Sequence, residues 1–170
     1  GLHLAVTAGV MILAGITLTK LIPYEYEGAK TFESMQLKGR TVAVKVVKDT
    51  KPLSETDLAL PRLDIIKSRG VLRVGYLSNS LPYIFRNDKG KLVGYDMELI
   101  HKFADDLGLT LEIILLKKIA TESKMLADGR IDIVIGGKAI TPMGALDSIY
   151  SDAYSHHTVG MITLDKYRDD

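Results

Sequence analysis

The stretch that decides the fold runs from Gly70 to Gly108 and reads GVLRVGYLSNSLPYIFRNDKGKLVGYDMELIHKFADDLG. A second stretch, Asp128 to Asp152, reads DGRIDIVIGGKAITPMGALDSIYSD. Apolar runs and helical spacings alternate along both, separated by polar or glycine-rich turns. The patterns predict strands at 71–76, 109–116, 131–135 and 157–164, and helices at 63–68, 96–107, 122–127 and 141–148. Strands that alternate with helices are typical of an α/β domain with a mostly parallel sheet and flanking helices.

The helix that follows Gly94 has the clearest signals at its ends. Asp96 is placed to cap its first turn, and Gly108 is placed to end it. Apolar residues recur at helical spacing between these points, which predicts one face turned to the core. That predicted face consists of Leu99, Ile100, Phe103 and Leu107.

Upstream of the domain, Leu2 to Ile22 reads LHLAVTAGVMILAGITLTKLI, with Lys20 near its end. About 20 apolar residues can cross a bilayer as a helix, so residues 1–23 are expected to form a transmembrane helix. A secretory signal and a buried core helix are the alternatives. The first residue is Gly1 and not Met, so we interpret the chain as a fragment or a processed form.

Residues 24–61 separate the predicted span from the domain, and we expect a juxtamembrane segment and a linker there. Thr41 to Val47 alternates well enough for a short strand. Lys48 to Pro61 is polar with two prolines and is expected to be extended and mobile. The globular part is expected at residues 62–170.

Composition excludes several classes of function. The 22 basic and 21 acidic residues are evenly mixed, so nucleic acid is not an expected partner. Cysteine is absent, which excludes disulfides, thiolate metal sites and cysteine nucleophiles. His156 and His157 are adjacent, and adjacent strand residues point to opposite faces, so we predict no metal site and no cofactor.

Ligands of parallel sheets bind outside the carboxyl ends of the strands. Two loops of this chain qualify, Leu77 to Phe85 and Gly136 to Met143. The second combines glycines with Lys138, Thr141 and free backbone N–H groups expected at a helix start, a set that suits an anion. In the first, Tyr83 or Phe85 could stack on a ligand. The alternative is that the glycines form a tight turn and Tyr83 packs in the core.

The order of these pieces resembles the extracellular solute-binding proteins of family 3, the polar amino-acid type. The resemblance runs from about Arg62 to Asp170 and rests on RGVLRVGY, LPYIFRNDKGKLVGYDMEL, LADGRIDIVIGG, AITP and SDAY. It implies the first lobe of a type II periplasmic-binding-protein clamp, cut off where the family chain crosses into its second lobe. With that lobe missing, high affinity is not expected of this chain alone.

The resemblance also implies ligand positions, residue by residue. Ser80 and Tyr83 match contacts or packing beside the ligand, and Gly137, Ala139 and Thr141 match the loop that holds it. The family's amino-acid binders carry an arginine for the α-carboxylate three residues beyond Thr141, where this chain has Gly144. Lys138 could supply charge instead, which completes the predicted ligand-binding set.

The resemblance leads us to expect a membrane-tethered domain that captures a small polar solute, an amino acid or organic acid, for a fused or separate membrane transporter. A weaker resemblance, carried by layout and Ser34 to Leu37 (SMQL), is to fusions with dicarboxylate/amino-acid:cation symporters. The expected location is the inner membrane, with the domain facing the periplasm or the cell exterior. A signalling sensor is the first alternative. Periplasmic dehydratases and lytic transglycosylases also resemble this family, but no acid/base pair is evident, so we expect no enzyme activity.

Overall fold

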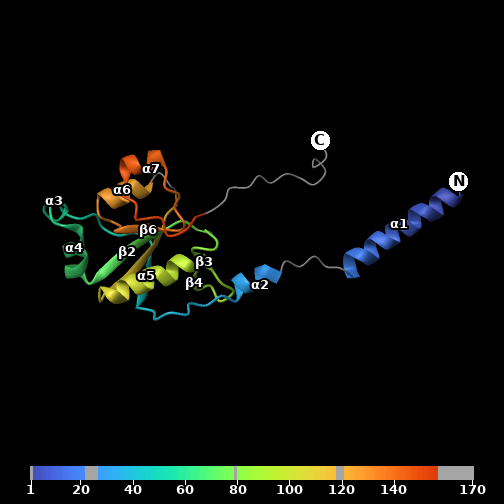
Figure 1. Ribbon diagram of the computed structural model, residues 1–170, viewed down its shortest axis with the longest axis horizontal. Coiled ribbons are helices and arrows are strands. Elements are labelled where there is room, and N and C mark those ends of the chain that lie inside the picture. The colour runs from blue at the N-terminus through green and yellow to red at the C-terminus, as the bar shows by residue number, and fades with distance from the viewer. Residues whose placement is uncertain (1, 22–26, 79, 118–120, 157–170) are drawn as a thin grey trace.

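A computed structural model describes residues 2–21, 27–78, 80–117 and 121–156 of the chain (Figure 1). The fourth predicted strand, residues 157–164, lies outside this range. The helices and strands, in chain order, are α1 (Leu2–Leu21), α2 (Glu27–Glu33), β1 (Val44–Val47), α3 (Glu55–Leu58), α4 (Arg62–Arg69), β2 (Val71–Tyr76), β3 (Phe85–Arg86), β4 (Leu92–Val93), α5 (Tyr95–Asp106), β5 (Thr110–Leu115), α6 (Glu122–Ala127), β6 (Ile133–Ile135) and α7 (Pro142–Asp147).

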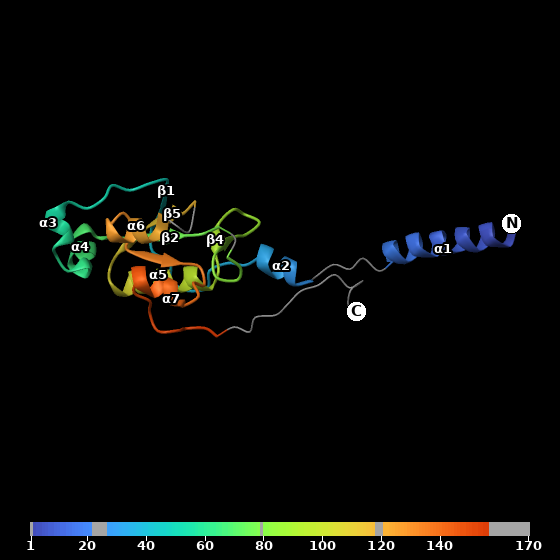
Figure 2. The same ribbon diagram turned by 90° about the horizontal axis from the view of Figure 1, so that it is seen from above.

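The main sheet has four parallel strands in the order β1-β5-β2-β6, which confirms the α/β prediction. Side chains alternate along β5, so Leu111 and Ile113 join one core cluster while Ile114 joins another. The first cluster includes Met97 and Ile100 of α5, and the second includes Met125 of α6. The two helices therefore cover opposite faces of the sheet (Figure 2).

The buried face of α5 differs from the predicted one. Ile100 is buried, but Leu99 and Phe103 are 46% and 45% exposed. The residues turned inward are Met97, Ile100, His101 and Ala104. A histidine lies on the inner face because the Nδ1 atom of His101 accepts a hydrogen bond from the Val42 N–H at 3.1 Å. A pattern that counts only apolar residues misses such a partner.

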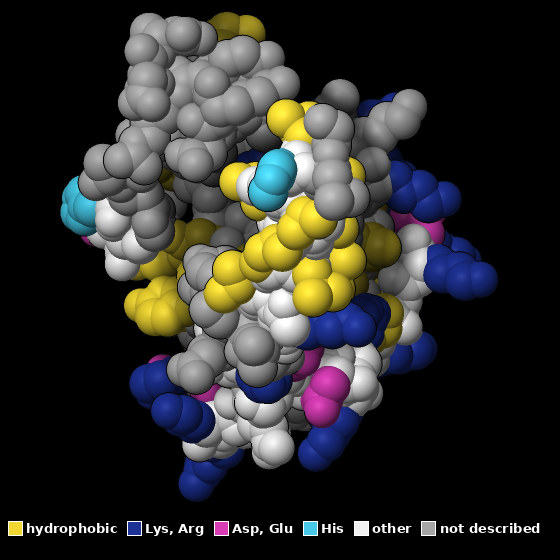
Figure 3. Space-filling model, turned by 90° about the vertical axis from the view of Figure 1, so that its right-hand side faces the viewer, with side chains coloured by type: hydrophobic (Ala, Val, Ile, Leu, Met, Phe, Trp, Pro, Cys, Tyr) yellow, Lys and Arg dark blue, Asp and Glu magenta, His cyan; other side chains and the backbone are white. Residues whose placement is uncertain are grey.

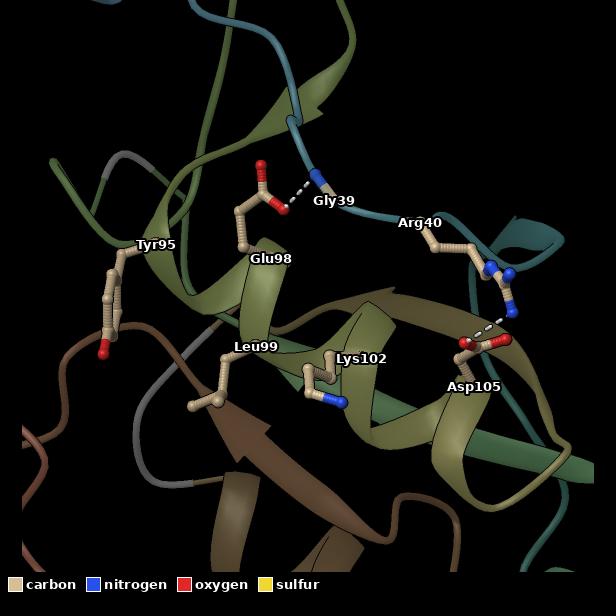
Figure 4. Close-up of a pocket in the computed structure, with 7 residues that line it drawn as sticks. All are labelled: Gly39, Arg40, Tyr95, Glu98, Leu99, Lys102 and Asp105. Atoms are coloured by element: carbon tan, nitrogen blue, oxygen red, sulfur yellow. Dashed lines mark hydrogen bonds and ion pairs between the residues drawn. The ribbon is translucent and has the colours of Figure 1, made fainter.

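Residues 35–53, which we call the strap, run along the lobe and include β1. The Gly39 N–H donates to the Glu98 carboxylate at 3.0 Å, and Arg40 pairs with Asp105 at 3.5 Å (Figure 4). Further along, the Leu53 N–H donates to the Asp128 carbonyl at 2.9 Å. Val44 to Val47 pair with β5 in the sheet. The expectation of a mobile segment from Lys48 is therefore wrong for its first part, and the sheet begins before residue 62.

Helix α1 lies apart from the sheet in both ribbon views (Figures 1 and 2). Its large apolar side chains from Leu4 to Leu18 are 52–81% exposed. Figure 3 faces the end of the molecule where α1 lies and shows hydrophobic side chains gathered at the centre of that face. Among the residues described, no helix has the length and hydropathy needed to span a membrane. The transmembrane helix predicted for residues 1–23 is thus not shown.

Candidate functional site

The two loops predicted to bind a ligand leave the same edge of the sheet. Strands β2 and β6 are parallel neighbours, and their last residues, Tyr76 and Ile135, are register partners. The chain beyond Tyr76 and the chain beyond Ile135 therefore begin side by side. This is the edge where α/β sheets hold ligands.

The glycine loop, residues 136–139, is held in place by Asp96. Gly136 and Gly137 have φ of 124° and 63°, which favours glycine at both positions. Their N–H groups donate to Oδ2 of Asp96 at 2.7 and 3.0 Å. These two N–H groups are therefore satisfied by a carboxylate of the chain itself. Asp96 was predicted to cap α5, but the N-cap position is Gly94.

Tyr154 is the third partner of Asp96. Its hydroxyl lies 3.0 Å from Oδ1 and 3.1 Å from Oδ2 of the carboxylate. Its ring stacks on Tyr95, with centroids 5.9 Å apart and planes 17° apart. Burial, together with the charge of Asp96, raises the pKa of Tyr154 to about 12. The hydroxyl therefore stays protonated at neutral pH and acts as a donor.

Ser80 and Tyr83 lie beside the glycine loop, as a shared site requires. A Cβ added to Gly137 would lie 2.3 Å from the Tyr83 ring, and one added to Gly136 would lie 3.3 Å from the Ser80 hydroxyl. The aromatic ring thus rests directly on the glycine backbone. Three of the predicted residues, Ser80, Tyr83 and Gly137, are brought together at this point.

The side chain of Lys138 is directed to Glu122 at the start of α6. Its Nζ atom lies 2.7 Å from Glu122 Oε1, and the two side chains are 26% and 14% exposed. The other carboxylate oxygen of Glu122 is buried without a hydrogen-bond partner among the described residues. Lys138 is thus a paired cation, and a ligand anion would have to share it with Glu122.

Ala139 and Thr141 are exposed beyond the glycine loop. The Thr141 hydroxyl accepts from the Gly144 N–H at 3.1 Å and so caps α7. A Cβ added to Gly144 would lie 2.0 Å from the Tyr150 hydroxyl. The place where the amino-acid binders carry an arginine is therefore taken up by a tyrosine hydroxyl.

Two surface hollows lie next to the strap and not over the glycine loop. One of about 330 Å³ is bounded by Gly39, Arg40 and the outer side of α5 (Figure 4). The other, of about 510 Å³, lies between Met35 and the tyrosines Tyr83, Tyr95 and Tyr154. Of the six predicted ligand residues only Tyr83 lines either hollow. We place the candidate site at the converging loops, because three of the predicted ligand residues, Ser80, Tyr83 and Gly137, meet there.

Sequence reasoning missed three residues that shape this edge. The role of Asp96 depends on its buried contact with a loop 40 residues away. Tyr154 was part of a motif, but no pattern gives its hydroxyl a partner. Glu122 was assigned only to a helix. Each role depends on a long-range contact, which one sequence does not reveal.

Among known proteins, the chain is similar to the membrane-bound lytic murein transglycosylase F of Vibrio vulnificus (strain YJ016). The two are 44% identical over 94 residues, which is 55% of this chain and 16% of the relative. The chain thus spans about a sixth of that enzyme. Because such relatives are enzymes by name, the expectation of no enzyme activity is overturned.

Two solved structures are similar to this chain over its α/β lobe. An ancestral cyclohexadienyl dehydratase is 32% identical, with a TM-score of 0.53 over 57% of this chain and 40% of its own. The arginine-bound form of domain 1 from TmArgBP is 34% identical, with a TM-score of 0.50 over 54% of this chain and 71% of its own. Both share the α/β lobe described above.

The model of one protein family matches residues 72–168, which covers β2, β5, β6 and the glycine loop. The predicted resemblance is thereby confirmed. The chain belongs to the bacterial extracellular solute-binding proteins, family 3.

Proposed function

We propose that the chain is the first lobe of an extracytoplasmic, membrane-tethered solute-binding domain. It captures a small polar solute, an amino acid or organic acid, at the carboxyl edge of its sheet. The observation that carries the proposal is the glycine loop, which Asp96 and Tyr83 hold in one conformation beside Ser80. A preformed polar edge of this kind lowers the entropy lost when a solute binds.

The proposed ligand contacts are Ser80, Tyr83, Gly137, Lys138, Ala139 and Thr141. The Tyr83 ring offers an aromatic face, while Ser80 and Thr141 offer hydroxyls. One lobe alone is a reasonable unit for binding, since domain 1 of TmArgBP was solved with arginine bound. That likeness supports binding by one lobe, and the prediction that high affinity needs the second lobe stays a prediction.

Calorimetry on the intact chain in detergent tests the proposal, with L-arginine, L-glutamate and succinate as probes. Gly137→Ala is the site variant, because the added Cβ would meet the Tyr83 ring at 2.3 Å. Gly90→Ala is its matched control, because Gly90 also has a positive φ, 69°, with nothing within 4 Å. We expect one probe to bind and Gly137→Ala alone to abolish binding. No binding by any probe, or equal loss in both variants, would contradict the proposal.

The membrane tether is the second part of the proposal, and α1 supplies it. Its exposed apolar side chains and the membrane-bound relatives support this role. The intact chain should float with phosphatidylethanolamine/phosphatidylglycerol vesicles, and Leu13→Lys with Ile16→Lys should prevent flotation. The control pair Leu60→Lys with Leu146→Lys, on exposed lobe residues, should still float. Sedimentation of the unaltered chain away from vesicles would refute a tether.

On this proposal the captured solute passes to a membrane transporter, fused or separate. Cross-linking in native membranes, followed by identification of the partner, tests it. A multi-span transporter is the expected partner. Recovery of a cell-wall hydrolase in its place would reject the transport role.

A second candidate is that the lobe serves an enzyme. The 44% identity to a lytic transglycosylase favours it, and so does the likeness to an ancestral dehydratase. Incubation of the intact chain with peptidoglycan, and separately with prephenate and arogenate, tests both chemistries. Release of muropeptides or loss of either acid would support the enzyme, and an inert chain would restrict the role of this lobe to binding.

A further inference from the structure

Asp96 is a buried carboxylate, and its hydrogen-bond donors within the described part of the chain are uncharged. It is 1% exposed, and its donors are the N–H groups of Gly136 and Gly137 and the Tyr154 hydroxyl. A buried carboxylate is stable only when such donors satisfy it. Loss of one donor therefore changes how strongly Asp96 holds the other two.

Tyr154 reaches Asp96 from a distant part of the chain. It follows α7 and lies in the exposed segment 151–156 that leads away from the lobe. Tyr154 attaches this segment to the lobe, with its hydroxyl on Asp96 and its ring on Tyr95. Asp96 and Tyr95 are neighbours in the first turn of α5. Movement of this segment would therefore withdraw a donor from Asp96.

The glycine loop is the part that responds to such a change. Oδ2 of Asp96 accepts both glycine N–H groups and also lies 3.1 Å from the Tyr154 hydroxyl. The Tyr83 ring rests against the Gly137 backbone on this loop. The loop geometry is thus fixed by a carboxylate on one side and a ring on the other.

We propose that Tyr154 is a positioning residue for the glycine loop, and that it links the loop to the segment leaving the lobe. This proposal rests on the proposed solute-binding function, and its consequence is that solute affinity depends on the Tyr154 hydroxyl. Its effect passes through Asp96 to the N–H groups of both glycines, and it reaches Gly137 directly as well, through a backbone hydrogen bond to the Tyr154 hydroxyl. The segment and the solute therefore influence each other through one carboxylate.

The test compares two phenylalanine variants of the stacked pair in the intact chain. Tyr154→Phe removes the hydroxyl on Asp96 and keeps the ring, while Tyr95→Phe removes a hydroxyl and keeps the same stack. Amide hydrogen exchange is followed by NMR at Gly136 and Gly137, with Val74 and Ile113 of the buried sheet as the reference for global stability. We expect Tyr154→Phe to speed exchange at both glycines by about tenfold, as the loss of one hydrogen bond implies, with no change at Val74 or Ile113. Tyr95→Phe should change none of the four.

Calorimetry with L-arginine gives the second readout. If arginine binds the unaltered chain, its affinity should fall several-fold in Tyr154→Phe and stay the same in Tyr95→Phe. Unchanged glycine exchange in Tyr154→Phe overturns the proposal, and so does faster exchange at all four amides alike. Failure of the unaltered chain to bind arginine counts against arginine as the proposed solute, while the exchange measurement still decides the role of Tyr154.

Discussion

Two aspartates lie buried at opposite edges of the same parallel sheet. Asp96 holds the glycine loop at the carboxyl edge, while Asp132, just before β6, holds the amino edge. The side chain of Asp132 is 1% exposed, and Asp96 is equally buried. Each accepts hydrogen bonds from the backbone of a neighbouring element. The side-chain donors differ in charge, because Asp96 accepts from a neutral tyrosine and Asp132 from an arginine.

Asp132 is surrounded by arginines. Its Oδ2 accepts the Arg73 N–H at 2.8 Å and forms an ion pair with Arg69. Burial raises the pKa of Asp132, and the arginines oppose that change. Burial likewise lowers the pKa of Arg69, which Asp132 opposes. Each charge is therefore retained because the other is present.

The donors at Asp96 are neutral, so the loss of one donor costs less free energy there than the loss of one ion costs at Asp132. Removing one ion of a buried pair leaves an uncompensated charge, which is strongly destabilising. Removing one neutral donor leaves a carboxylate that still has two. The amino edge is thus built for stability, and the carboxyl edge can be rearranged at a smaller cost in free energy.

Asp132→Asn should produce the largest loss of stability. The variant leaves Arg69 buried without its anion, and we expect the free energy of unfolding to fall by about 3–5 kcal/mol. Urea unfolding of the intact chain measures this. Solute affinity per folded molecule should not change. A loss smaller than that of Asp96→Asn would break the comparison between the two edges.

Asp96→Asn should have a smaller effect on stability and a larger one on binding. Weaker hydrogen bonds to Gly136, Gly137 and Tyr154 should lower the free energy of unfolding by about 2–3 kcal/mol. Urea unfolding and calorimetry with the bound probe measure the two effects. Retention of full affinity in this variant would show that the loop is not the site.

The pair of Lys138 and Glu122 sharpens the comparison, since it puts an ion pair at the carboxyl edge. Lys138→Met should lower the free energy of unfolding by about 1–2 kcal/mol, because Glu122 is left as a largely buried anion. Glu122→Gln should lower it less, because Lys138 is 26% exposed and can turn to water. If an anionic probe binds, it should bind more weakly to Lys138→Met. The reverse order of stability, or unchanged anion affinity, would remove Lys138 from the proposed site.

His101 should make the smallest contribution, and it depends on pH. Burial lowers the pKa of His101, and nearby Glu98 opposes this. The pKa of His101 is therefore lower in the folded state than in the unfolded state. Neutral His101 contributes its full stabilisation above about pH 6.5, and this stabilisation is lost as the pH falls through the folded-state pKa. The loss should be about 1 kcal/mol, since protonated Nδ1 no longer accepts the Val42 N–H. In His101→Gln, this pH-dependent part should disappear from urea midpoints measured between pH 7 and pH 5.

Local patterns predicted the elements well. The strand at 71–76 was predicted to the residue, and the helices at 62–69 and 122–127 lie within a residue of prediction. Gly108, expected to end α5, has a φ of 68° and follows its last residues. Hydrophobic spacing and glycine conformation act over a few residues, so one sequence is enough to detect them.

Contacts between distant residues were not predicted. Lys48 to Pro61 was interpreted as a mobile linker because its composition is polar, yet the Leu53 N–H donates to the Asp128 carbonyl. A short strand was predicted at Thr41 to Val47, but neither its pairing with β5 nor the bond from Val42 to His101 was. Asp96 was assigned to its own helix because a cap is the local use of an aspartate, whereas its partners lie about 40 residues away or further. Tyr83, Lys138, Thr141 and the glycines were proposed from the loops themselves, whereas Ser80 and Ala139 came from resemblance to a family, and all six ligand positions remain predictions. What a side chain does at the site depends on which segments the fold brings to it.

The strap also determines how the lobe would bear mechanical force. A pull on the chain from α1 first reaches the turn after β3, where the Glu33 carbonyl accepts the Asp88 N–H and the Met35 carbonyl accepts the Asn87 side-chain amide, both at 2.9 Å. It then reaches Glu98 and His101 of α5 through the N–H groups of Gly39 and Val42. It reaches β1 next, where four residue pairs with β5 would be loaded together along the strand direction. Strand β2 and the glycine loop lie on the far side of β5 from this point. Tension in the tether would therefore load the turn after β3, the first turns of α5 and the β1 edge of the sheet before it reached the glycine loop.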